Sequence, residues 1–164
     1  MTRLANCADD RKVFQCAVQL LQRVPYWVLA VPLRLAVATI FWNSAMTKLA
    51  NWDAALELFR DEYRLPVLPP DVAAYSAVSI ELSMPVLLVL GLGVRPAALV
   101  LLGMTSVIEI FVYPQAWPTH IQWAAMLLVL LCRGAGALSL DHLIRQRWWR
   151  DASSEFPGRQ RGDS

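Results

Sequence analysis

Long apolar runs are the dominant pattern of this chain. Three of them, residues 26–49, 72–91 and 96–113, contain between 18 and 24 residues each and almost no strongly polar side chains. A fourth run, residues 120–138, is more often interrupted, and Arg133 lies within it. A transmembrane helix needs about 20 mainly apolar residues, within a range of about 17–25. The pattern therefore predicts four membrane-spanning helices.

The alternative to membrane helices is a soluble helical bundle, in which each helix would carry a polar face toward water. The four runs show no such face. Composition points the same way, because 57% of the 164 residues are hydrophobic and 17% are charged, against about 45–50% and about 25% in soluble domains. We therefore predict an all-α fold, an integral membrane four-helix bundle formed by residues 26–138.

Shorter amphipathic segments flank the predicted spans. In residues 1–25, apolar side chains recur at helical spacing from Phe14 to Val24, which predicts a short helix that lies on the membrane surface or packs on the bundle. Residues 52–63 show a similar apolar stripe. In residues 139–164, an interfacial helix is expected first and then a disordered tail, since the last dozen residues lack apolar periodicity.

The distribution of Lys and Arg predicts the orientation. Eleven of them lie before residue 26, at Arg95 or from Arg133 onward, whereas three lie in or beside the acidic 50–71 segment. Because positive loops stay in the cytoplasm, we expect a multi-pass protein of the bacterial inner membrane with both termini cytoplasmic. The net charge of +2 gives no reason to expect a nucleic-acid partner. The expected partners are the lipid bilayer and other proteins, and self-association is left open.

Motifs for known chemistry are missing from the sequence. It contains three cysteines without a C-x-x-C pair, and its two histidines, His120 and His142, fall on opposite sides of the predicted membrane. The spacing of these residues matches no zinc site, so we predict no metal. No cofactor motif is evident, and catalytic residues are not assigned. We leave open whether the chain is an enzyme and favour a non-enzymatic role.

Ionisable residues inside the predicted spans are the main candidates for function, because such residues are costly in a bilayer. Arg34 and Glu81 lie roughly 12 and 15 Å from the cytoplasmic ends of their helices, counted at about 1.5 Å per residue. An arginine and a glutamate at similar depth on neighbouring helices would relieve each other's burial cost. We therefore predict an intramembrane ion pair between Arg34 and Glu81.

A second group of polar residues is expected in the outer half of the membrane. Four residues of the third span share one helical face, with three others at a similar level: Thr105, Ser106, Glu109 and Tyr113, then Asn43, Lys48 and His120. This outer polar cluster has two interpretations. It is either a set of hydrogen bonds that holds helices together, or a ligand site that opens outward. The sequence favours the first.

The sequence also resembles a known family. The resemblance covers residues 30–145 and rests on three segments: LRLAVATIFWNSAMTKL, IELSMPVLLVLGLGVRPAALVLLGM and GAGALSLDHLI. These are similar to the DoxX family of small bacterial four-helix membrane proteins. Two further segments, LFRDEYRLPVLPP and FVYPQAWPTHIQWA, are similar to those of a DoxX subgroup. The genes of that subgroup lie beside genes for the maturation of metal-binding peptides.

The resemblance implies a set of functions rather than one. The DoxX family is named for quinone oxidoreductase subunits of sulfur oxidation, and some relatives are linked to membrane complexes that handle oxidative or thiol stress. It therefore implies an accessory or scaffold subunit of a redox, oxidative-stress or metal-handling membrane system. The alternatives are a quinone-interacting oxidoreductase subunit, with quinone as cofactor, and a small-solute transporter. The transporter is disfavoured because the chain is short and has no inverted repeat.

Overall fold

The structure is a computed structural model and describes residues 10–63, 68–144 and 146–147. Within these residues it contains helices and no strand. The elements, in chain order, are α1 (Asp10–Gln22), α2 (Tyr26–Ala50), α3 (Trp52–Leu58), a π-helical turn (Phe59–Tyr63), α4 (Pro70–Leu90), α5 (Val94–Phe111), a 3₁₀ turn (Pro114–Ala116) and α6 (Trp117–Arg133). The prediction of an all-α protein is confirmed.

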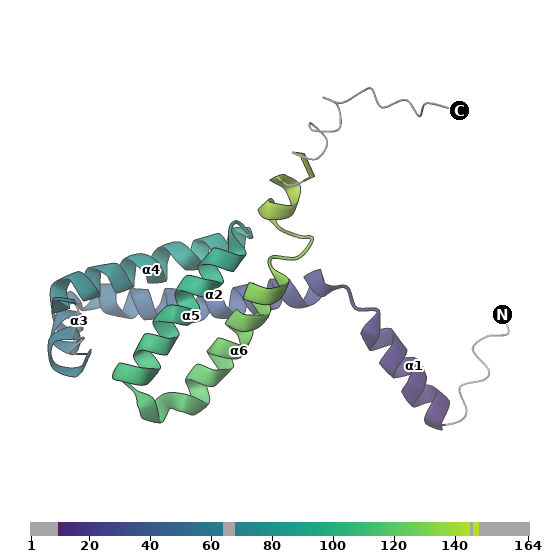
Figure 1. The fold of residues 1–164 in the computed structure, drawn as a ribbon, viewed down its shortest axis with the longest axis horizontal. Helices are drawn as coiled ribbons and strands as arrows, with labels where there is room; N and C mark the ends of the chain where they lie inside the picture. Colours follow the sequence, from purple (N-terminus) through teal and green to yellow (C-terminus); the bar gives the residue numbers. More distant parts are fainter. Residues whose placement is uncertain (1–9, 64–67, 145, 148–164) are drawn as a thin grey trace, which may run out of the picture.

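Four helices make up the body of the molecule. α2 packs along α4, α5 packs along α6, and contacts of α4 with α5 and of α2 with α6 join the two pairs. Figure 1 shows α1 leaving this body at the start of α2, and α3 turning across its opposite end. We call the end where α2 and α5 begin the basic end, and the end that carries α3 the capped end.

Three of the described helices, α2, α4 and α5, are long and apolar enough to cross a membrane. Their bounds agree within two residues with the predicted spans 26–49, 72–91 and 96–113. α6 differs from the predicted span 120–138: it begins at Trp117, ends at Arg133 and has 17 residues. Gly134, with φ 79°, ends the helix, and residues 134–138 form a loop. That α6 crosses the membrane stays a prediction.

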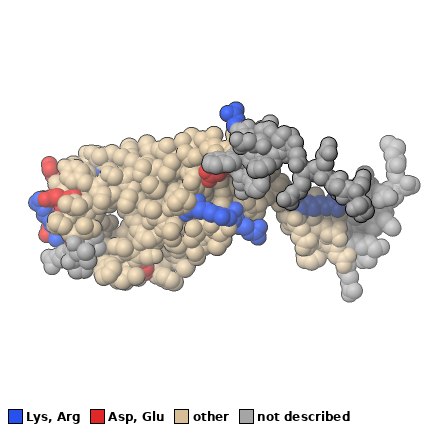
Figure 2. Space-filling model, turned by 45° about the horizontal axis from the view of Figure 1, so that its top comes forward, with Lys and Arg blue, Asp and Glu red and all other residues tan. Residues whose placement is uncertain are grey.

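Small residues line many of the contacts between helices, together with buried leucines such as Leu88 and Leu101, and many other large apolar residues face outward. Seven alanines of α2, α4 and α5 are almost fully buried: Ala30, Ala38, Ala45, Ala73, Ala74, Ala97 and Ala98. In contrast, Leu99 and Ile110 are 57% and 67% exposed. Figure 2 shows a broad, nearly uncharged belt between two ends at which charged side chains gather. Small residues inside and large apolar residues outside are typical of helices that pack in lipid.

The flanking segments differ in their contacts. In α1 the apolar side chains of Phe14, Leu20 and Leu21 are about 70% exposed, so they do not pack on the bundle. At the capped end, Phe59 is 3% exposed and packs with Ala73, Ala74 and Ala77 of α4. Residues 140–144 are helical, as expected. The segment 1–9 and the predicted tail lie outside the described residues.

Gly91 ends α4 at the point where three segments meet. Its φ of 69° is in the left-handed region, and a Cβ at this position would lie 2.5 Å from Arg34 Nη1 and 2.7 Å from Ser139 Cβ. Side chains other than glycine avoid this backbone conformation at a cost of about 1–2 kcal/mol. The close packing of α2, α4 and the 134–139 loop therefore requires glycine at residue 91.

We predict that Gly91→Ala lowers the free energy of unfolding by more than about 1 kcal/mol, because strain and steric overlap act together. Gly103→Ala is the matched control: Gly103 lies inside α5, and a Cβ there would meet nothing within 4 Å. The control should be neutral or stabilising. Thermal unfolding in detergent measures both, and equal midpoints for the two variants would contradict the packing described for Gly91.

Candidate functional site

Glu81 is the most deeply buried charged residue of the described chain, with 1% of its surface exposed. Lys48 Nζ of α2 lies 2.8 Å from each oxygen of the Glu81 carboxylate, and Ser44 Oγ donates a hydrogen bond of 3.0 Å to Oε1. Lys48 Nζ also donates to Ser44 Oγ at 2.7 Å. Ser44 and Lys48 are one helical turn apart, so both reach the same carboxylate on α4. The result is a closed polar triad between α2 and α4.

Arg34 is bound by backbone rather than by a carboxylate. It is 5% exposed, and its Nη1 and Nη2 atoms donate to the carbonyl oxygens of Ala135 and Leu138 at 3.1 and 3.0 Å. Tyr26 Oη adds a 3.0 Å hydrogen bond to the carbonyl oxygen of Gly134. Carbonyls that no longer have helical partners accept these bonds. Arg34 thus anchors the loop that follows α6 to the start of α2.

The predicted Arg34–Glu81 ion pair is wrong, and the register of α2 against α4 explains why. Glu81 meets Ser44, whereas Gly91 meets Arg34. These contacts place Arg34 about 15 Å from the level of Glu81 along the helix axes, since each pair is ten residues apart. The sequence argument took Tyr26 to be level with Gly91. In the structure α2 extends two turns beyond α4 at the basic end.

The outer polar cluster divides into separate contacts. Glu109 Oε2 of α5 and His120 Nδ1 of α6 are in hydrogen-bond contact, and the His120 ring packs on Trp123 at 5.1 Å. Tyr113 Oη donates to Glu62 instead. Lys48 belongs to the triad with Glu81. The remaining three predicted members do not join them: Thr105 is buried and donates to the carbonyl of Leu101, Ser106 is exposed and donates to that of Leu102, and Asn43 is exposed.

Two residues that the sequence argument missed complete the site. Ser44 could have been found from its i, i+4 spacing to Lys48. Tyr63 could not, because it reaches the bundle only through the π-helical turn, where its ring packs on Phe59 at 4.4 Å and on Tyr113 at 6.2 Å. Burial raises the pKa of Tyr63 to about 12, with smaller contributions from the nearby phenol of Tyr113 and the side chains of Glu81 and Glu62. Its phenol is therefore protonated at neutral pH.

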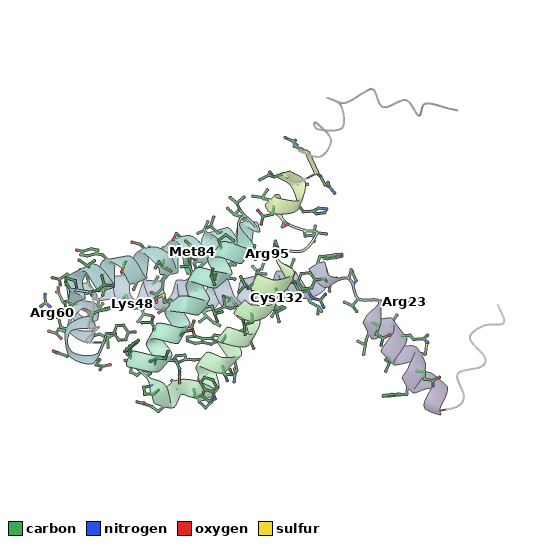
Figure 3. The ribbon with its side chains drawn as sticks, viewed as in Figure 1. Arg23, Lys48, Arg60, Met84, Arg95 and Cys132 are labelled. Carbon is green, nitrogen blue, oxygen red and sulfur yellow. The ribbon has the colours of Figure 1, made fainter. Side chains whose placement is uncertain are left out.

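A cavity of about 190 Å³ lies beside the triad. Its lining is mainly apolar and comes from α4, α5 and the capped end, including Ser76, Ile80, Met104, Phe59 and Tyr63, with Lys48 among the lining residues. Figure 3 shows Lys48 inside the bundle, whereas Arg60 lies at the capped end and Arg95 and Cys132 lie toward the basic end. The arrangement places the protonated phenol of Tyr63, a hydrogen-bond donor, at an apolar cavity within the helices, beside a Lys48 ammonium that is bound by Ser44 and Glu81.

Metal-binding side chains do not gather in the part of the chain that the structure describes. No group of three or more His, Cys, Asp or Glu side chains is placed to hold a metal ion there. Cys16 and Cys132 are both exposed and unpaired by disulfide.

The fold and these buried polar contacts define an all-α membrane protein. The model of the DoxX family matches residues 29–114, which comprise most of α2 and all of α3, α4 and α5. The chain belongs to the DoxX family. It is also 30% identical over 126 residues to an uncharacterized protein of Haemophilus influenzae (strain ATCC 51907 / DSM 11121 / KW20 / Rd), an alignment that covers 70% of this chain and 82% of that relative. No solved structure matches the chain.

Proposed function

We propose that this DoxX protein is an accessory subunit of a redox, oxidative-stress or metal-handling system in the bacterial inner membrane. The observation that carries the proposal is that the charged groups inside the bundle contact other protein groups. Glu81 is bound by Lys48 and Ser44, and Arg34 is bound by backbone carbonyls. Such contacts fix helices in one register, which suits a rigid platform that presents its ends to other proteins.

The proposed orientation has the basic end in the cytoplasm. Arg23, Arg95 and Arg133 lie at the basic end, whereas the capped end carries mostly acidic residues: Asp53, Glu57, Asp61, Glu62 and Asp71. The positive-inside rule therefore favours cytoplasmic termini. In this orientation α1 leaves the bundle on the cytoplasmic side, where its exposed apolar side chains favour contact with the membrane surface.

We expect the chain to migrate in a native gel of mildly solubilised membranes as part of an assembly larger than its own 18.4 kDa. A strain without the gene should become more sensitive to oxidants, thiol reagents or copper, and the plasmid-borne gene should restore growth. Migration of the chain alone, together with unchanged growth under all three stresses, would reject the accessory role. Transport of a solute by vesicles containing only this protein would favour the transporter instead.

A second candidate function is binding of a quinone, and the cavity beside Lys48 specifically supports it. The volume of about 190 Å³ exceeds the roughly 150 Å³ of an engineered apolar cavity that binds benzene. Quinone carbonyls are hydrogen-bond acceptors, and the protonated phenol of Tyr63 supplies a donor at the cavity wall. The apolar lining from α4 and α5 suits a ring that enters from the bilayer.

We predict that Ser76→Leu lowers the amount of quinone that copurifies with the protein at least several-fold, because the larger side chain fills the cavity. Ser79→Leu is the matched control: both serines lie on α4 and donate to a backbone carbonyl within their own helix, but Ser79 does not line the cavity. Extraction and quantification of quinone per protein measures the effect. Equal quinone content in both variants, or none in the unmodified protein, would exclude this candidate.

A further inference from the structure

A second, larger cavity lies at the basic end, away from the Lys48–Glu81 triad. Its volume is about 600 Å³, and its walls come from the start of α5, the end of α6 and the loop that follows. Arg95 and Arg133 line it from two different helices, and Asp141 lines it from the chain after the loop. Figure 3 shows Arg95 near the end of α6, close to Cys132. Two guanidinium groups therefore share one concave surface.

Neither arginine is neutralised by a carboxylate within the described residues. Arg95 Nη2 donates one hydrogen bond of 3.3 Å to the carbonyl of Cys132, which leaves most of its five N–H donors available. The Arg133 guanidinium lies 5.8 Å from the centre of the Tyr26 ring, a cation–π distance. Each guanidinium is thus held on one side by the protein, and no carboxylate of residues 10–63, 68–144 and 146–147 pairs with its charge.

The carboxylate of Asp141 is engaged elsewhere. It accepts hydrogen bonds from the backbone N–H groups of Gly93 and Val94, at 2.9 and 3.4 Å, and so caps the first turn of α5. Behind the wall, Arg34 donates to the carbonyl of Ala135, which itself lines the cavity. Two arginines and one aspartate line the cavity, so among these residues the positive charge is in excess and the cavity favours an anion.

We propose that this cavity binds a phosphate group. Planar guanidinium groups pair with phosphate oxygens through two parallel hydrogen bonds, and two arginines from different helices can hold one phosphate from two sides. The cavity lies at the end of the membrane-spanning helices, at the level of lipid head groups, where basic pockets between helices bind anionic lipids. The phosphate comes from such a head group or from a soluble phosphate ester, and the experiment separates these two sources.

The test uses the full chain purified in detergent and native mass spectrometry, with dioctanoyl phosphatidylglycerol, glycerol 3-phosphate and inorganic phosphate as probes. The double variant Arg95→Gln with Arg133→Gln should bind its preferred probe at least about tenfold more weakly, because two charge-assisted contacts are lost. Arg23→Gln is the control, since Arg23 is exposed at the same end but does not line the cavity. Its binding should equal that of the unmodified protein.

Binding of the lipid without competition from glycerol 3-phosphate or phosphate would identify a head group as the source. Binding of either soluble probe, with displacement of the lipid, would identify a soluble phosphate ester. If the double variant unfolds, Arg95→Lys with Arg133→Lys retains the charge and should retain partial binding. The proposal fails if no probe binds the unmodified protein, or if Arg23→Gln weakens binding as much as the double variant does.

Discussion

A charged side chain inside a membrane bundle must find its partner within the protein, and α2 carries two such side chains, Arg34 and Lys48. They lie fourteen residues, or close to four helical turns, apart and therefore on one face of the helix. Lys48, in the last turn of α2, meets Glu81 in the middle of α4, and Arg34 meets the carbonyls of the loop after α6. These two contacts fix α2 against α4 and against the loop that follows α6.

The loop after α6 connects the helices at the basic end of the fold. Arg34 and Tyr26 of α2 bind its carbonyls, while Asp141 caps α5 and its own N–H group donates to the carbonyl of Gly91. Gly91 leaves room for this arrangement because it has no side chain. The segment GAGALSLD, one of those that suggested the DoxX family, therefore has a structural role: it connects the ends of all four long helices. The same connection places Arg95 and Arg133 around one cavity.

The sequence predicted the helices well and the partners of the buried charges poorly. The span bounds follow from membrane thickness, which demands a fixed number of apolar residues. The contact of Glu109 with His120 agrees with the prediction that they could be neighbours. Partner choice depends on axial register, and counting from helix ends gives the register only when the ends are level. Because α2 extends beyond α4, counting residues from the helix ends placed Arg34 level with Glu81, whereas in the structure Arg34 lies beside Gly91.

Two other misjudgements have equally specific causes. The apolar run of the fourth segment continues through Ala135 and Leu138, so hydropathy could not show that Gly134 ends the helix. The sequence could not show which polar residues of a helix face protein. Asn43 of α2 and Ser106 of α5 are exposed, whereas Lys48 and Thr105 on the same two helices are not. The side of a helix that faces lipid is decided by tertiary packing, which lies beyond a single-helix pattern.

The choice of partner for Glu81 is the central claim, and a comparison of two double variants measures it most directly. Glu81→Leu alone should lower the free energy of unfolding by about 3–5 kcal/mol, because Lys48 is left buried and unpaired. Adding Lys48→Met should restore most of that loss, whereas adding Arg34→Met should increase it, because Arg34 anchors the loop independently. Restoration by Arg34→Met, with none by Lys48→Met, would contradict the structure and reinstate the pair of Arg34 with Glu81.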